Sequence, residues 1–142
     1  FLAAADTALR NGDAAYVLML DFDHFKQIND RHGHVAGDAV LAAAVPAMRA
    51  AVTGDLVIGR YGGEEFALLL RAHSDHGIAL AERIRRAAGE GGARALGSRG
   101  SVTASVGCAA VAAHDTIERA LEAADRALYA AKLAGRDRLV EA

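Results

Sequence analysis

The chain has 142 residues, of which 53% are apolar, and it carries a formal net charge of −2. This length and apolar content predict a single compact domain with its own core. A nearly neutral chain offers no broad cationic surface, so we expect no binding to nucleic acid and no contact with a membrane. Any anionic ligand must be held by a few local cations.

The single cysteine, Cys108, lies within an apolar run, and we expect a reduced thiol in the core, as in cytosolic proteins. The sequence contains no signal peptide and no apolar stretch long enough to span a membrane. It opens at Phe1 inside a helical pattern and ends just after a strand-like run at 138–140. We therefore expect a cytoplasmic domain cut from a longer protein, which is free to carry a membrane anchor elsewhere.

Apolar residues at helical spacing predict helices, and short unbroken apolar runs predict strands. In chain order we expect helix 1–10, strand 16–20, helix 23–31, helix 38–52, strands 56–58 and 66–70, helix 79–88, strand 101–111, helix 115–135 and strand 138–140. Segment 89–100 is rich in glycine and is expected to be a loop with room for one short strand. The order predicts an α+β palm-like fold, with a mainly antiparallel sheet of about five strands flanked by helices.

Several polar residues have a purely local explanation. Asp23 and Asp38 are expected to be helix N-caps. Asp115, with Glu118 three residues later, resembles a capping box. The arginines of helix 79–88 lie opposite its apolar stripe and are expected to face solvent: Arg83, Arg85 and Arg86.

A Gly-Gly step, Gly62-Gly63, separates two of the predicted strands. This is typical of a β-hairpin, because glycine accepts a positive φ. Two carboxylates, Glu64 and Glu65, follow the turn directly. Adjacent like charges repel, so a counter-charge is expected, and a divalent metal ion is the natural one. A solvated acidic turn explains the hairpin equally well when it is considered alone.

Asp21 closes the apolar run 16–20 and supplies a third carboxylate at the edge of the sheet where ligands gather in α/β folds. If this strand lies beside the hairpin, Asp21, Glu64 and Glu65 suit one or two Mg²⁺ ions bound together with substrate phosphates. In a regular strand Glu64 and Glu65 face opposite sides. Both therefore reach a metal only where the turn interrupts that alternation.

Three cations are available for phosphate oxygens: Lys26, Lys132 and Arg136. The last two also complement the dipole of the final helix, which requires no ligand. Asn29 and Asp38 offer an amide and a carboxylate to the edge of a guanine, which carries N–H donors. The spacing indicates a nucleotide site without identifying the nucleotide.

Together, four segments resemble the GGDEF family, the diguanylate cyclases, in the Gly-Gly-Glu-Glu-Phe version of the motif. They are 21–30, 33–38, 60–66 and 124–136, and they follow the family's order along the chain. The resemblance implies one catalytic domain over 1–142 that condenses two GTP into cyclic di-GMP and releases two pyrophosphates. Because the product needs two new bonds, a two-fold homodimer is expected, in which each copy supplies half of the site. An upstream sensory or regulatory domain is also implied.

The resemblance implies a role for each matching residue. Asp21, the Phe22 carbonyl, Glu64 and Glu65 would bind Mg²⁺, or Mn²⁺ in its place, and Glu64 would accept the proton of the attacking 3′-hydroxyl. The implied substrate contacts are Asn29 and Asp38 with guanine, His34 beside the substrate, and Phe25, Lys26, Gly62, Gly63, Lys132 and Arg136 around the phosphates.

Two departures from the family pattern bear on regulation and affinity. The family's Arg-x-x-Asp product-inhibition site would fall at Thr53 and Leu56, which have neither side chain, so we expect no product inhibition there. The family's Asp-x-Leu-Thr stretch with Asn-Arg-Arg, which helps to close the guanine pocket, is not in this sequence. We therefore expect weak GTP binding.

Two other functions fit the same residues. The first is a signalling module of this fold that binds GTP or dimerises without turnover. The second is a palm-type cyclase that makes a mononucleotide. Incubation with GTP and Mg²⁺ separates the first from an active enzyme, and chromatography of the product separates the second.

Overall fold

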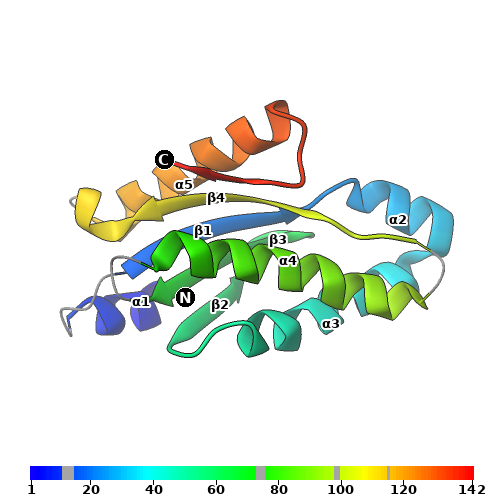
Figure 1. The fold of residues 1–142 in the computed structure, drawn as a ribbon, viewed down its shortest axis with the longest axis horizontal. Coiled ribbons are helices and arrows are strands. Elements are labelled where there is room, and N and C mark those ends of the chain that lie inside the picture. The colour runs from blue at the N-terminus through cyan, green and yellow to red at the C-terminus, as the bar shows by residue number, and fades with distance from the viewer. Residues whose placement is uncertain (11–14, 73–75, 98–99, 115) are drawn as a thin grey trace.

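The computed structural model of the chain describes residues 1–10, 15–72, 76–97, 100–114 and 116–142. Its elements are α1 (Leu2–Leu9), β1 (Ala15–Phe22), α2 (Phe25–His32), α3 (His34–Ala50), β2 (Leu56–Arg60), β3 (Glu65–Arg71), α4 (Gly77–Leu96), β4 (Ala104–Ala110), the 3-10 turn η2 (Val111–Ala113), α5 (Ile117–Leu133) and β5 (Leu139–Glu141). Figure 1 shows one sheet with helices packed against it.

The sheet has five strands in the order β2-β3-β1-β4-β5. β1 is antiparallel to both β3 and β4, and β2 is antiparallel to β3, whereas β5 runs parallel to β4. The predicted α+β fold with a mainly antiparallel sheet is confirmed. Because β1 and β3 are antiparallel, the carboxyl end of β1 lies beside the start of β3, where the β2–β3 turn ends.

β1 is the central strand, and all eight of its residues are buried. Leu18 and Leu20 belong to the core that the sheet forms with α2, α3 and α4, whereas Val17 and Met19 belong to the core formed with α1 and α5. A strand covered on both faces requires an unbroken apolar run. The prediction that 16–20 forms a mid-sheet strand is therefore confirmed.

The prediction of a loop over 89–100 is wrong, because α4 continues through the glycines to Leu96. A Cβ added at Gly91 would lie 2.6 Å from the Cβ of Ala47 in α3, and one at Gly89 would lie 2.7 Å from a backbone carbonyl oxygen just before β4. The glycines therefore let α4 approach its neighbours closely. This packing outweighs their low helix propensity.

Two expectations about helix starts are also affected. Asp38 is not an N-cap, because α3 begins at His34 and Asp38 lies exposed within the helix. Asp115 lies outside the described residues. At the start of α5 the Thr116 hydroxyl accepts a hydrogen bond from the Arg119 backbone N–H at 3.2 Å.

Arg85 was expected to face solvent but is buried, with 8% of its surface exposed. Its guanidinium forms ion pairs with Glu82 and with Asp137, which follows α5. Helical periodicity identifies the face that packs on the sheet, but it cannot reveal that the C-terminal turn covers a second face of α4. Arg83 and Arg86 are exposed, as expected.

Cys108 is a buried free thiol, as expected. Burial raises the pKa of this thiol to about 12, because a thiolate is poorly solvated there. Among the helices that the structure describes, none combines the length and apolar character needed to cross a membrane.

Gly91→Ala tests whether close packing sets the position of α4. We expect the free energy of unfolding to fall by about 1–3 kcal/mol, because the added methyl group meets Ala47. Helix propensity alone predicts a gain of about 1 kcal/mol. Urea denaturation followed by circular dichroism measures the difference, with Glu90→Ala at the exposed neighbouring position as control. A Gly91→Ala chain as stable as the original would contradict the packing, and in an Ala47→Gly background the penalty should shrink.

Candidate functional site

Asp21 lies near the carboxyl end of β1 and is buried, with 6% of its surface exposed. Its partner across the sheet is Glu65, the first residue of β3. Lys132, in the last turn of α5, donates a hydrogen bond from Nζ to Asp21 Oδ2 at 2.6 Å. Two neighbouring strands and the final helix thus bring two acidic residues and one ammonium group to the same end of the sheet.

The electrostatics of this cluster favour added positive charge. Burial raises the pKa of Glu65 above its ordinary value, and the charge of Asp21 raises it further, whereas Lys132 lowers it. A single ammonium therefore does not fully offset the two carboxylates. A cation or a proton at Glu65 would relieve the remaining repulsion.

Glu64 lies just before β3, so the side-chain alternation of a strand does not apply to it. The Phe22 backbone N–H donates to the Glu64 carbonyl oxygen at 3.4 Å, which places the Glu64 backbone beside the end of β1. Its side chain is half-buried. Glu64 and Glu65 therefore both flank the end of the central strand.

Arg60 holds the turn that precedes these residues. Its guanidinium donates to the carbonyl oxygen of Gly63 from Nη2 at 2.7 Å and to that of Gly62 from Nε at 3.2 Å. Neither glycine has a positive φ, so the conformational reason for expecting them is wrong. A Cβ at Gly62 would lie 3.0 Å from Oε2 of Glu65, whereas one at Gly63 would meet nothing within 4 Å. Gly62 therefore makes room for Glu65, and Gly63 leaves the turn open.

Among the described residues, no group of three or more His, Cys, Asp or Glu side chains is arranged as a ready-made metal site. The donors at the end of β1 nevertheless fit a hard divalent cation. Asp21 and Glu65 supply carboxylate oxygens. Asp21 already binds one positively charged group, the Lys132 ammonium.

The groups expected to contact phosphates lie on two segments. Lys26 is exposed in the first turn of α2, and Arg136 is exposed in the turn after α5. α2 begins after His24, whose φ is 52° and whose side chain makes no capping hydrogen bond to the first turn. The backbone N–H groups of Phe25 and Lys26 therefore lie at an uncapped helix start, where an anion is favoured.

The groups expected to contact guanine lie where α2 meets α3. A Cβ at Gly37 would overlap Oδ1 of Asn29, so the Asn29 amide packs directly against the residue that precedes Asp38. His34 and Asp38 are exposed near the start of α3. The structure thus brings Asn29 and Asp38 into one neighbourhood.

Asp23, expected to be the N-cap of α2, has another role. It is buried and accepts hydrogen bonds from the hydroxyls of Thr103 at 2.7 Å and Ser105 at 2.6 Å, and from the backbone N–H of Asp137 at 3.0 Å. His24 takes the N-cap position. Asp23 therefore joins the end of β1 to β4 and to the turn after α5.

Two acidic residues near the site were not identified from the sequence. The charge of Asp125 on α5 contributes to the raised pKa of Glu65. Asp125 precedes Lys132 by seven residues and so shares a helix face with it, a spacing that could have identified it. Asp137 carried no comparable signal, because its partners come from distant segments.

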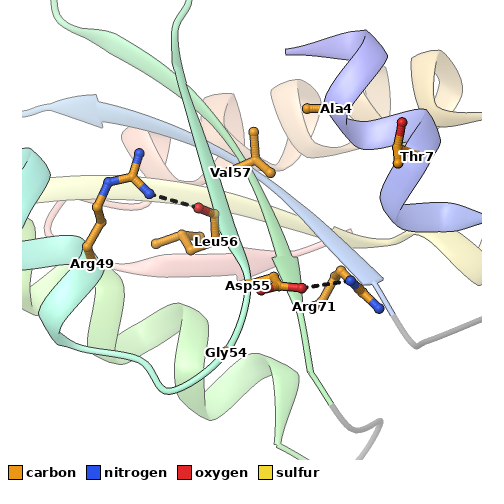
Figure 2. Close-up of a pocket in the computed structure, with 8 residues that line it drawn as sticks. All are labelled: Ala4, Thr7, Arg49, Gly54, Asp55, Leu56, Val57 and Arg71. Carbon is orange, nitrogen blue, oxygen red and sulfur yellow. Dashed lines mark hydrogen bonds and ion pairs between the residues drawn. The ribbon is translucent and has the colours of Figure 1, made fainter. Parts of the chain in front are cut away.

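A cavity of about 450 Å³ lies away from these carboxylates, beside α1 and β2 (Figure 2). Within it, Arg49 donates to the Leu56 carbonyl oxygen at 3.0 Å, and Arg71 pairs with Asp55 at 2.7 Å. These charged groups are engaged by the protein itself. The side chains of Thr53 and Leu56 are uncharged, so neither supplies the charge that the product-inhibition site requires.

Comparison with known proteins identifies the family. Residues 2–138 match the family described as diguanylate cyclase, GGDEF domain. The chain is 44% identical over 131 residues to the diguanylate cyclase DgcP of Pseudomonas aeruginosa, covering 92% of this chain and 20% of that protein. It is 37% identical over 139 residues to the diguanylate cyclase VdcA of Vibrio cholerae, covering 94% and 41%. The chain thus spans about a fifth to two fifths of the length of these relatives.

Solved structures agree with this match. The active GGEEF domain of a diguanylate cyclase from Vibrio cholerae superposes with a TM-score of 0.81 at 29% identity, covering 98% of this chain and 89% of that one. The GGDEF domain of DgcB from Caulobacter crescentus, in complex with c-di-GMP, gives 0.77 at 30% identity, covering 99% and 84%. The resemblance seen in the sequence is confirmed, and the chain belongs to the diguanylate cyclase GGDEF-domain family of nucleotidyltransferases.

Proposed function

We propose that residues 1–142 form the catalytic domain of a diguanylate cyclase that condenses two GTP molecules into cyclic di-GMP and releases two pyrophosphates. The observation that carries the proposal is the meeting of Asp21, Glu65 and Lys132 at one end of the sheet. Opposed carboxylates beside an ammonium suit a triphosphate that arrives with divalent cations. The names of the relatives, and the c-di-GMP held by the DgcB domain, support this product.

The proposed metal ligands are Asp21, the carbonyl oxygen of Phe22, Glu64 and Glu65. They are hard oxygen donors, which Mg²⁺ prefers and Mn²⁺ also accepts. When bound, such ions offset the negative charge of the triphosphate and polarise its α-phosphoryl group. The pKa of Glu65 is raised because its negative charge is poorly compensated, and a cation bound there would supply that compensation.

The proposed substrate contacts divide into a guanine end and a phosphate end. Asn29 and Asp38 would pair with the guanine edge, with His34 beside the substrate. The phosphates would be held by cations and turn amides: Phe25, Lys26, Gly62, Gly63, Lys132 and Arg136. The open space at Gly63 and the uncapped start of α2 support this division.

In the proposed reaction Glu64 accepts the proton of the 3′-hydroxyl of one GTP. The 3′-oxygen then forms a bond to the α-phosphorus of the other GTP. The bond from that phosphorus to the bridging oxygen breaks, and pyrophosphate leaves with the bonding electrons. The second closure repeats the same step in the opposite direction.

Two such closures require two substrates that face each other. One domain supplies one set of guanine and phosphate contacts, so we propose a two-fold homodimer in which each copy holds one GTP. We also propose that a further segment, sensory or regulatory, brings two copies together. The relatives are longer than this chain and have room for such a segment.

Mass analysis of the products formed from GTP and Mg²⁺ at high protein concentration tests the proposal. Cyclic di-GMP with two equivalents of pyrophosphate is the expected result. GTP binding without turnover would instead support a signalling module, and a cyclic mononucleotide would support a different cyclase. Fusion to a dimer-forming segment should raise the rate only for the cyclase.

Glu64→Gln should lower turnover by at least about a hundredfold, because the amide cannot accept the proton and general base catalysis is commonly of this size. The melting temperature should change little, since Glu64 lies outside β3. Coupled detection of pyrophosphate measures the rate. Glu122→Gln, at an exposed position of α5, is the matched control. Undiminished product formation by Glu64→Gln would refute the role as base.

The raised pKa of Glu65 predicts a pH-dependent stability. Glu65 ionises less readily in the folded chain than in the unfolded chain. The free energy of unfolding therefore falls as the pH rises from 4.5, the ordinary pKa of the glutamate side chain, through the raised pKa of Glu65 in the folded chain. Thermal unfolding in EDTA should therefore show Glu65→Gln gaining melting temperature over the original chain at pH 8 but not at pH 4. Mg²⁺ should raise the melting temperature of the original chain more than that of the variant. A difference that is the same at every pH would contradict this account.

A further inference from the structure

The turn that joins α5 to β5 has an unusual backbone. Gly135, Arg136 and Asp137 follow one another with φ values of 120°, 65° and 47°. Positive φ is costly for residues other than glycine, by about 1–2 kcal/mol each. A run of this kind persists only when the surrounding structure fixes it.

Arg85 fixes the turn from the side of α4. Its guanidinium donates to both carboxylate oxygens of Glu82, at 2.9 Å and 2.6 Å, which sets its orientation within its own helix. Nη1 then donates to the Ala104 carbonyl oxygen at 3.1 Å and to Asp137 Oδ1 at 2.5 Å. One buried arginine therefore connects α4, β4 and the turn.

Asp23 fixes the same residue from the side of β1. Its Oδ2 accepts the Asp137 backbone N–H at 3.0 Å, while the hydroxyls of Thr103 and Ser105 hold the carboxylate in place. The next residue of the turn, Arg138, accepts the Val106 backbone N–H through its carbonyl oxygen at 2.9 Å. Asp137 is thus held through its side chain by Arg85 and through its backbone by Asp23.

The held turn carries the cations that the proposed function assigns to phosphate. Arg136 directly precedes Asp137, and its own N–H is bonded to the Ala131 carbonyl oxygen at 3.0 Å. Lys132 lies in the last helical turn before it and contacts Asp21, two residues before Asp23. Figure 1 shows this turn, between α5 and β5, at the end of the sheet where β1 runs into α2.

We infer that Asp23, Arg85 and Asp137 are positioning residues that hold Arg136 at the phosphate end of the site. The inference rests on the proposed function, because it needs a triphosphate at that end. None of the three residues touches the reacting atoms in this scheme. They fix a strained turn, and Arg136 acts on the substrate. If these three residues only stabilised the fold, substituting them would weaken the binding of guanine and the binding of phosphate equally.

The test compares two probes by NMR titration in the presence of Mg²⁺. One is a GTP analogue with a methylene bridge between the α- and β-phosphates, which cannot release pyrophosphate, and the other is guanosine. Asp137→Ala and Asp137→Gly both remove the carboxylate, and glycine does so without strain at a φ of 47°. We expect both variants to bind the analogue about tenfold more weakly, as for loss of one charge-assisted contact. Guanosine affinity should stay within about twofold.

Two further variants separate positioning from general destabilisation. Asp137→Asn keeps an acceptor for Arg85 and tolerates the left-handed backbone, so it should retain analogue affinity within about threefold. In an Arg136→Ala background, Asp137→Ala should add less than about twofold, because the residue through which it acts is gone. Asp55→Ala removes an exposed carboxylate that pairs with Arg71 at the opposite end of β3, and it should change neither affinity.

The results distinguish failure of the positioning role from failure of the proposed function. If Asp137→Ala and Asp137→Gly weaken analogue and guanosine equally, or if their effect adds fully to that of Arg136→Ala, the positioning role is overturned while the proposed function stands. If the original chain binds guanosine and the analogue with equal affinity, the phosphate end itself is absent. In that case both the proposed function and this inference are overturned.

Discussion

The structure depends on charge compensation at the end of its central strand. β1 is buried on both faces, yet Asp21 lies one residue before its end, opposite the acidic Glu65. Taking carboxylates out of water is costly unless opposite charge comes with them. Lys132 supplies part of that charge from the last turn of α5, and the pKa of Glu65 stays raised because burial and Asp21 exceed what one ammonium offsets. An added cation at this end of the sheet would therefore relieve the remaining repulsion between the carboxylates.

The rest of the fold serves to bring these groups together. The antiparallel pairing of β1 with β3 places the start of β3 beside the end of β1, so a hairpin turn and a strand end share one edge. α5 packs along β4 so closely that a Cβ at Gly107 would overlap the helix backbone at Ala124. This contact sets how near the last turn of α5 comes to the sheet. The position of Lys132 is therefore decided by packing far from its ammonium group.

Much of this could be predicted from the sequence, and the failures share one cause. Unbroken apolar runs identified β1 as central, because only a strand covered on both faces lacks alternation. The loop expected over 89–100, by contrast, followed from the propensity of glycine, which is a local property. The helix continues through Gly91 because it packs closely on α3, and at that distance Ala47 leaves no room for a side chain at position 91. Arg85 and Asp23 were misplaced for the same reason. Asp137, which binds the Arg85 guanidinium, lies 52 positions further along the chain, and the hydroxyls that bind Asp23 lie 80 and 82 positions away. Local patterns identify elements, whereas tertiary partners decide what a polar residue does.

The two aspartates at the end of β1 illustrate this point. Asp21 and Asp23 are the same residue type, two positions apart, and both are buried. Asp21 meets an ammonium and a second acidic residue, so its charge is only partly satisfied and it is available to a cation. Asp23 meets two hydroxyls and a backbone N–H, which are neutral donors that satisfy its lone pairs without drawing in a ligand. A carboxylate whose hydrogen bonds come from neutral donors is suited to holding a turn in place. A carboxylate that faces both a positive and a negative group is suited to binding a cation. The division of labour between them is therefore set by what faces each side chain across the sheet rather than by its place in the motif.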